Sequence, residues 1–134
     1  MTIDFDKYSL FVDAVTSDSS KDYKSFIASL QLLDKQGSNI NRLTTAAVGI
    51  SAEGGEFMEI VKKMLFQGKP WDEHNRKHLS IELGDVMWYV MQACKALDVS
   101  IEEVVAGNVD KLKKRYPGGE FNVYQSENRK EGDL

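Results

Sequence analysis

Apolar residues recur along the chain at the spacing that places them on one face of an α-helix. The first such stripe covers residues 5–15, and a polar stretch at 16–20 interrupts it. A second stripe runs to about Lys35 and ends at a Gly-Ser-Asn sequence at 37–39. Sustained alternation of apolar and polar residues, which is typical of β-strands, occurs nowhere. The pattern therefore predicts helices.

Three longer helices are expected in the rest of the sequence. One covers about residues 41–66 and is closed by a Gly-Lys-Pro sequence. The next spans about 72–97, with Asp72 as its N-cap, and the last opens with a Ser-Ile-Glu-Glu capping box at 100–103. Short loops between long helices favour antiparallel neighbours. We therefore expect an all-α fold, an antiparallel bundle of about five helices.

Length and composition suit one domain with its own core. The chain has 134 residues, and we expect a single domain over residues 1–134. Residues 118–134 are polar and are expected to form a flexible tail. Cys94, the one cysteine, lies in an apolar run, which predicts a buried, reduced thiol.

Charge and hydropathy exclude several partners. The net charge of -4 argues against a grip on a nucleic acid polymer. No apolar run approaches the roughly 20 residues that span a bilayer, and no basic leader opens the sequence. We therefore expect a cytoplasmic protein without a membrane partner, in the host cytoplasm if it is phage-encoded.

Two pairs of acidic residues stand out because the segments around them are apolar. The stretch 79–94 is apolar nearly all round, which is typical of a helix buried in a core or an oligomer interface. Its charges are Glu82 and Asp85, which are neighbours on one helix face. Glu53 and Glu56 repeat this spacing in the preceding helix.

Four carboxylates brought together would repel each other, and burial alone would favour their protonated form. A hard divalent cation removes both problems, and an all-oxygen ligand set suits Mg²⁺ or Mn²⁺. Since Mg²⁺ commonly takes phosphate oxygens, a phosphate ester is the expected substrate class. Gly54 and Gly55, between the first two carboxylates, predict either a close packing contact or a local kink.

The last helix, which opens at about residue 100 and ends near Tyr116, supplies cations. Asn108 and Arg115 fall within its apolar stripe and Lys111 lies at the edge, which makes all three candidates for phosphate or sugar contacts. The alternative for Lys111 and Arg115 is a helix C-terminus that favours positive charge.

Histidine and aromatic residues are weaker candidates. His74 and His78 are four residues apart, but they lie in the polar start of their helix, which favours a solvated face. Trp71, Trp88 and Tyr89 have the rings to stack on a base, although aromatic residues at helical spacing are typical of a core.

These residues resemble the MazG-like nucleotide pyrophosphohydrolases of the all-α NTP pyrophosphatase superfamily, in their short, single-domain, phage or bacterial form. That family carries an E-x-x-E pair and, on the next helix, an E-x-x-D pair, matched here by Glu53-Gly54-Gly55-Glu56 and Glu82-Leu83-Gly84-Asp85. Its following helix carries a pattern matched by Asn108, Lys111, Arg115, Tyr116 and Pro117. The resemblance covers about residues 41–117.

The resemblance implies an enzyme that uses Mg²⁺, or Mn²⁺ as a substitute, to hydrolyse a nucleoside triphosphate, (d)NTP, to (d)NMP and pyrophosphate. It implies four metal ligands (Glu53, Glu56, Glu82 and Asp85), with Glu53 or Glu56 as proton acceptor. It also implies substrate contacts by Asn108, Lys111, Arg115 and Tyr116. Family members are commonly dimers of dimers, so a homotetramer with a four-helix-type core is expected.

One position departs from the family pattern, because Ala52 stands where many relatives have a further glutamate before the first pair. One magnesium ion is therefore the secure minimum. Two alternative functions stay open: hydrolysis of an alarmone such as ppGpp, and a non-catalytic helical module that binds a nucleotide or a partner protein.

Overall fold

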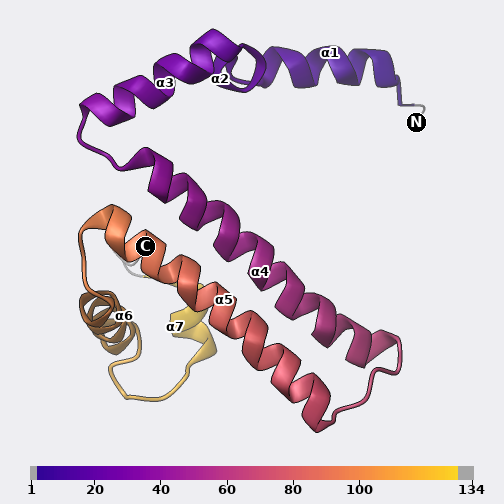
Figure 1. Ribbon diagram of the computed structural model, residues 1–134, viewed down its shortest axis with the longest axis vertical. Coiled ribbons are helices and arrows are strands. Elements are labelled where there is room, and N and C mark those ends of the chain that lie inside the picture. The colour runs from indigo at the N-terminus through magenta and orange to yellow at the C-terminus, as the bar shows by residue number, and fades with distance from the viewer. Residues whose placement is uncertain (1–2, 130–134) are drawn as a thin grey trace. The chain divides into compact units, whose positions relative to one another are not determined.

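The computed structural model describes residues 3–129, and this part of the chain forms seven α-helices and no strand (Figure 1). The expected all-α class is confirmed. The chain divides into two compact units, residues 1–40 and 41–134. The expectation of one domain over 1–134 stays a prediction.

The first unit contains α1 (Phe5–Val15), α2 (Asp18–Lys21) and α3 (Tyr23–Lys35). The polar stretch at 16–20, which predicted only a break, forms most of α2. The amide of Asp22 donates to the carbonyl of Asp18, and its carboxylate accepts from the amide of Ser25, so one residue ends α2 and caps α3. A helix of four residues has no apolar period, which is why periodicity missed it.

Two long helices dominate the second unit. These are α4 (Ile40–Phe66) and α5 (Glu73–Leu97), which run antiparallel and side by side (Figure 1). Asp72 is the N-cap of α5, as predicted, and accepts from the amide of Asn75 at 2.8 Å. The buried side chain of Asn75 donates to the carbonyl of Pro70 at 2.7 Å, which fixes the turn between the helices.

A glycine sets the closest approach of α4 and α5. A Cβ atom on Gly49 would overlap the ring of Tyr89, so a side chain at this position would push the helices apart. Ala46, which is 1% exposed, precedes Gly49 by one turn, and Ile60 is buried further along α4. Small residues at one end of α4 therefore let its backbone lie close to α5.

The second unit continues with α6 (Ile101–Arg115), which contacts α5. The predicted capping box is present: the amide of Glu103 donates to Ser100 Oγ, and the amide of Ser100 donates to Glu103 Oε2. Asp98 adopts a left-handed conformation with φ of 53°, which ends α5 and reverses the chain toward α6.

Within the expected flexible tail the chain forms one further short helix, α7 (Val123–Glu127), which periodicity did not predict. The side chain of Asn122 accepts from the amide of Gln125 and caps this short helix. Residues 130–134 of the predicted tail lie outside the described residues.

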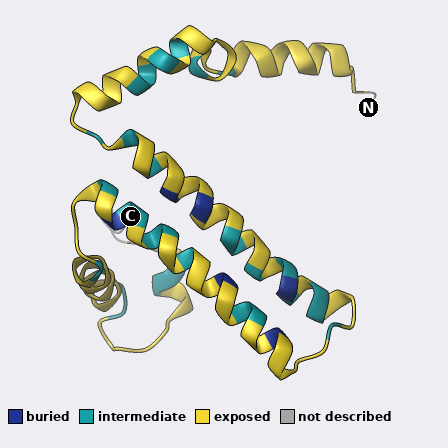
Figure 2. Ribbon diagram, in the orientation of Figure 1, coloured by how far each residue is buried: buried dark blue, intermediate teal, exposed yellow. Residues whose placement is uncertain are grey.

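Few apolar side chains are buried within a single chain. Among the described residues, the buried apolar ones are Ala46, Ile60 and Cys94 (Figure 2). The prediction for Cys94 is confirmed. The apolar residues of α5 are 41% to 54% exposed at Ile81, Leu83, Met87, Trp88 and Met91. Intramolecular packing therefore does not bury α5 on most sides.

The apolar stripe expected on α6 is also open, since Val104, Val105 and Leu112 are exposed. The contact of α6 with α5 is small, and it leaves this stripe uncovered within the described chain. No helix among the described residues is both long enough and apolar enough to cross a membrane.

Candidate metal centre

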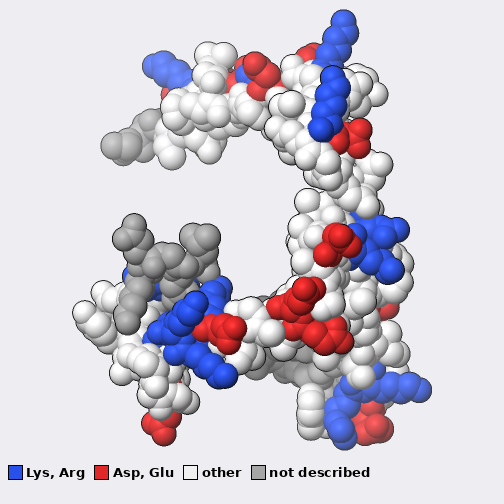
Figure 3. Space-filling view, turned by 90° about the vertical axis from the view of Figure 1, so that its left-hand side faces the viewer, with Lys and Arg blue, Asp and Glu red and all other residues white. Residues whose placement is uncertain are grey.

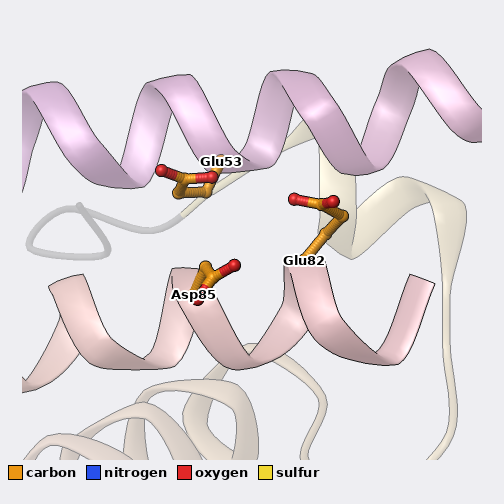
Figure 4. A group of neighbouring side chains, drawn as sticks. All are labelled: Glu53, Glu82 and Asp85. Atoms are coloured by element: carbon orange, nitrogen blue, oxygen red, sulfur yellow. The ribbon is translucent and has the colours of Figure 1, made fainter. Parts of the chain in front are cut away.

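Three carboxylates from two helices come together between α4 and α5. Glu53 projects from α4, and Glu82 and Asp85 project from α5 toward it (Figure 4). One oxygen of each lies within 4.8 Å of the others. Oxygen atoms at this separation are close enough to share one hard divalent cation.

The antiparallel register of α4 and α5 explains this meeting. Gly49 lies against Tyr89. One turn along, Glu53 follows Gly49 on α4, and Asp85 precedes Tyr89 on α5. Because the helices run in opposite directions, these equal steps bring Glu53 opposite Asp85. The contact at Gly49 therefore sets how closely the two carboxylates face each other.

The three carboxylates differ in burial. Glu82 is 6% exposed, Glu53 is half-buried and Asp85 is exposed. The group thus has one ligand in the helix interface and one at the surface. A cation held here would keep an open side for water or a phosphate oxygen.

The surroundings of Glu53, desolvation above all, raise its pKa above the usual value. Desolvation is the largest cause, and the negative charges of Glu56, Asp85 and Glu82 add to it. The folded chain therefore places mutually repelling carboxylates side by side. A bound divalent cation would remove this repulsion, so the residues present fit a metal.

Glu56 lies outside this group of three. Its side chain is exposed, although its charge acts on Glu53. The set of four metal ligands therefore stays a prediction, with three members gathered within the described chain.

The glycine pair at 54 and 55 has no close neighbour. A Cβ atom on either Gly54 or Gly55 would meet nothing within 4 Å, and α4 runs through both without a break. The expected close contact is therefore wrong for these positions within one chain. The close contact lies at Gly49, which the spacing of carboxylates did not single out.

His78 has a place beside the carboxylates that the polar helix start did not suggest. Its Nε2 lies 2.9 Å from Glu82 Oε1, one helical turn along α5. The side chain of His78 is still 44% exposed, in line with the expected solvated face, and His74 is exposed as expected. The four-residue step from His78 to Glu82 was the signal available in the sequence.

The residues expected to bind substrate lie on α6 and directly after it. Asn108 is exposed, whereas Lys111, Arg115 and Tyr116 are half-buried. Lys111 and Arg115 already interact with other groups of the chain, and the ring of Tyr116 lies 5.9 Å from that of Phe121. These residues are not part of the group of three carboxylates.

The surface around α6 is mixed in charge. The last turn of α6 is basic at Lys113, Lys114 and Arg115. Seen from the side of the molecule where α6 lies, lysine and arginine side chains gather next to acidic ones (Figure 3). Positive charge therefore gathers at the C-terminal end of α6.

The aromatic candidates are more exposed than a core role predicts. Trp71 is 70% exposed and Trp88 is 54% exposed. Tyr89 packs on Gly49, and its ring lies edge-on to that of Trp88 at 4.8 Å. Of the three, Tyr89 packs between the helices, as expected of an aromatic residue in a core.

Comparison with known proteins identifies the family. The family model of the MazG nucleotide pyrophosphohydrolase domain matches residues 42–119. This chain belongs to the MazG family. The match includes α6 and α5 and nearly all of α4, so it contains every candidate site residue. It leaves α1, α2, α3 and α7 outside.

A phage relative agrees with the MazG assignment. The chain is 39% identical over 82 residues to the Gene 37 protein of Mycobacterium phage L5, which covers 60% of this chain and 72% of that protein. A phage relative is consistent with the short phage or bacterial type of MazG protein. No solved structure matches the chain.

Proposed function

We propose that this MazG protein is a Mg²⁺-dependent nucleoside triphosphate pyrophosphohydrolase that converts (d)NTP to (d)NMP and pyrophosphate. The observation that carries the proposal is the group of Glu53, Glu82 and Asp85, whose oxygens lie within 4.8 Å of one another in a MazG domain. Family membership indicates nucleotide pyrophosphohydrolase activity, and the carboxylates supply the donor set for the metal.

Glu53, Glu82 and Asp85 would hold the cation, with Glu56 as a fourth ligand one turn from Glu53. Mg²⁺ prefers oxygen ligands, and Mn²⁺ would substitute for it. When bound, the ion would neutralise triphosphate charge and activate water for attack on phosphorus. The exposed side of Asp85 supports this assignment, because substrate and water need access to the ion.

One glutamate of α4 is proposed to accept the proton of the attacking water. It is either Glu53 or Glu56, since both carboxylates lie on α4 beside the proposed cation site. Attack at the α-phosphorus breaks the bond to the bridging oxygen and releases pyrophosphate. The cations Lys111 and Arg115 would hold the β- and γ-phosphates and offset developing charge. Asn108 and Tyr116 would contact the sugar or a phosphate.

We also propose a homo-oligomer, specifically a tetramer built as a dimer of dimers. The support is the exposed apolar surface of α5 and α6, which one chain leaves open. A second copy of the chain that covers these faces would bury the exposed apolar side chains of α5 and α6.

The decisive experiment measures pyrophosphate release with Mg²⁺ across the eight common (d)NTPs, with ppGpp assayed beside them. At least one (d)NTP is expected to give pyrophosphate, and chelation of Mg²⁺ is expected to abolish the release. Asp85→Ala and Glu56→Ala are expected to lose activity by a factor of about 100 or more while remaining helical. Asp34→Ala, an exposed carboxylate outside the MazG match, is the matched control and should retain full activity.

The other outcomes separate the alternatives. Full activity in Asp85→Ala would overturn the metal assignment. Turnover of ppGpp without turnover of any (d)NTP would favour an alarmone hydrolase. No turnover, combined with thermal stabilisation by a nucleotide, would favour a non-catalytic binding module.

A further inference from the structure

His78 lies one turn before Glu82 on α5, and its Nε2 is 2.9 Å from Glu82 Oε1. This is a close polar contact between an imidazole nitrogen and a carboxylate oxygen. Glu82 is the most buried of the three gathered carboxylates at 6% exposed, whereas the side chain of His78 is 44% exposed. A half-exposed imidazole thus holds one oxygen of a buried carboxylate.

The nature of this contact follows from chemistry. An ionised carboxylate has no hydrogen of its own, so the contact is attractive only if Nε2 of His78 carries one. That hydrogen is present in the imidazolium ion and also in one tautomer of the neutral ring. The contact therefore needs no particular charge on His78.

An attractive contact at one oxygen restricts the whole carboxyl group. A glutamate side chain has three rotatable bonds, and the terminal one is broad in its preferences. With Oε1 held by His78, the group loses rotation about its last bond, and the remaining lone pairs keep a defined direction. Glu82 shares the site with Glu53 and Asp85, within 4.8 Å, so its orientation affects how the three oxygens converge.

The nearby lysines of α4 make different contacts. Lys62 and Lys63 both pair with Glu59, further along α4 than Glu53. A lysine carries a permanent charge that would repel a divalent cation at close range, whereas a neutral imidazole donates a hydrogen bond without that charge. Histidine is therefore a suitable residue to orient a metal ligand.

We infer that His78 is a positioning residue that orients Glu82 for binding the divalent cation. This inference rests on the proposed function, because it needs a metal at the three carboxylates. Groups that orient metal ligands through hydrogen bonds typically change metal affinity by about 10- to 100-fold when removed. His78 itself is not proposed to touch the metal or the substrate.

The test measures Mn²⁺ binding directly, from the electron paramagnetic resonance signal of free Mn²⁺, in the full-length protein. His78→Leu removes the N–H donor, and we expect it to weaken Mn²⁺ binding about 10- to 100-fold. His78→Gln keeps an N–H donor at a similar reach and should recover most of the affinity. His74→Leu, the same change at the exposed histidine one turn earlier, should bind Mn²⁺ as the unmodified protein does.

A second readout separates positioning from general damage to the fold. The Mg²⁺ concentration that gives half-maximal pyrophosphate release should rise in His78→Leu, whereas the rate at saturating Mg²⁺ should recover to near that of the unmodified protein. Helical circular dichroism is recorded for each variant. If His78→Leu is not folded, the comparison of His78→Gln with His78→Asn, whose shorter side chain cannot reach Glu82, takes its place.

Three results would overturn the inference. These are unchanged Mn²⁺ affinity in His78→Leu, equal losses in the donor-keeping and donor-lacking variants, and no Mn²⁺ binding by the unmodified protein. If the unmodified protein binds Mn²⁺ but releases no pyrophosphate, the proposed function fails while the role of His78 is still decided by the binding data.

Discussion

Desolvation, together with carboxylate repulsion, gives Glu53 a direct effect on stability. Its pKa is raised by desolvation and by the charges of Glu56, Asp85 and Glu82. A carboxyl group with a raised pKa binds its proton more tightly in the folded chain than in the unfolded one. Its contribution to stability is therefore full below the ordinary glutamate value of 4.5 and is lost as the pH rises through the raised pKa.

We expect the metal-free protein to lose stability through Glu53 as the pH rises from about 4.5 toward neutrality. Glu53→Gln should remove this loss and raise the unfolding temperature at neutral pH in the presence of a chelator. The pH dependence of the unfolding temperature is measured by circular dichroism between about pH 4 and 8.

Glu59→Gln serves as the control of opposite sign. Hydrogen bonds from Lys62 and Lys63 lower the pKa of Glu59, so its ionised form stabilises the fold above the ordinary glutamate value. Glu59→Gln should therefore lower the unfolding temperature at neutral pH. A Glu53→Gln variant with the same pH profile as the unmodified protein would contradict the repulsion described for the site.

The acidic residues of the site could be predicted from the sequence because charge is rare in their apolar surroundings. That contrast singled out Glu53, Glu82 and Asp85. The partner of Glu82 could not be found in the same way, since His78 lies in a polar segment where a histidine is usually solvated. The contact between His78 and Glu82 depends on the rotamers of both side chains, which residue types do not determine.

At the level of helices, the contact of Gly49 with Tyr89 controls the spacing of α4 and α5. We expect Gly49→Ala to destabilise the fold by about 1–3 kcal/mol, because a Cβ atom there overlaps the Tyr89 ring. The same change should weaken Mn²⁺ binding, because the contact lies one turn from both Glu53 and Asp85. Chemical denaturation and Mn²⁺ titration measure the two effects.

Gly107→Ala, in the middle of α6, is the matched control. A Cβ atom there meets nothing within 4 Å, so alanine should be neutral or stabilise the helix by up to about 1 kcal/mol. Equal stability of Gly49→Ala and Gly107→Ala would contradict the close contact between Gly49 of α4 and Tyr89 of α5.

Helix boundaries could be predicted where capping and periodicity agree. Asp72 before α5 and the Ser100–Glu103 box before α6 gave starts that the structure confirms. The short helices α2 and α7 were missed, since each is only about one turn long and has no apolar period. The close approach at Gly49 was missed because it depends on the register between two helices, which no single segment encodes.

For the whole molecule, the balance of buried and exposed apolar residues is unusual. A chain of this length normally buries enough apolar surface to form a core. Here the buried apolar residues within 3–129 are Ala46, Ile60 and Cys94, while large apolar side chains along α5 stay exposed. The all-α class could be predicted from the pattern alone, but the residues that partner this surface could not.

We expect the protein to form a stable oligomer, a tetramer in the proposed arrangement, detectable by sedimentation velocity. Its unfolding temperature should rise with protein concentration, because association is linked to folding. Met87→Glu, which places a charge on the exposed apolar surface of α5, should reduce the oligomer and lower the unfolding temperature. A monomer whose unfolding temperature is independent of concentration would contradict this expectation.

The three gathered carboxylates and the contact that spaces them all lie within residues 49–89, on the two arms of one helical hairpin. These contacts all close the same hairpin, so they share one loop-closure cost in entropy. A cation that binds all three carboxylates would therefore stabilise the hairpin as a unit. The ligand set is also a short, continuous segment, so insertion or recombination outside it would leave the carboxylates together.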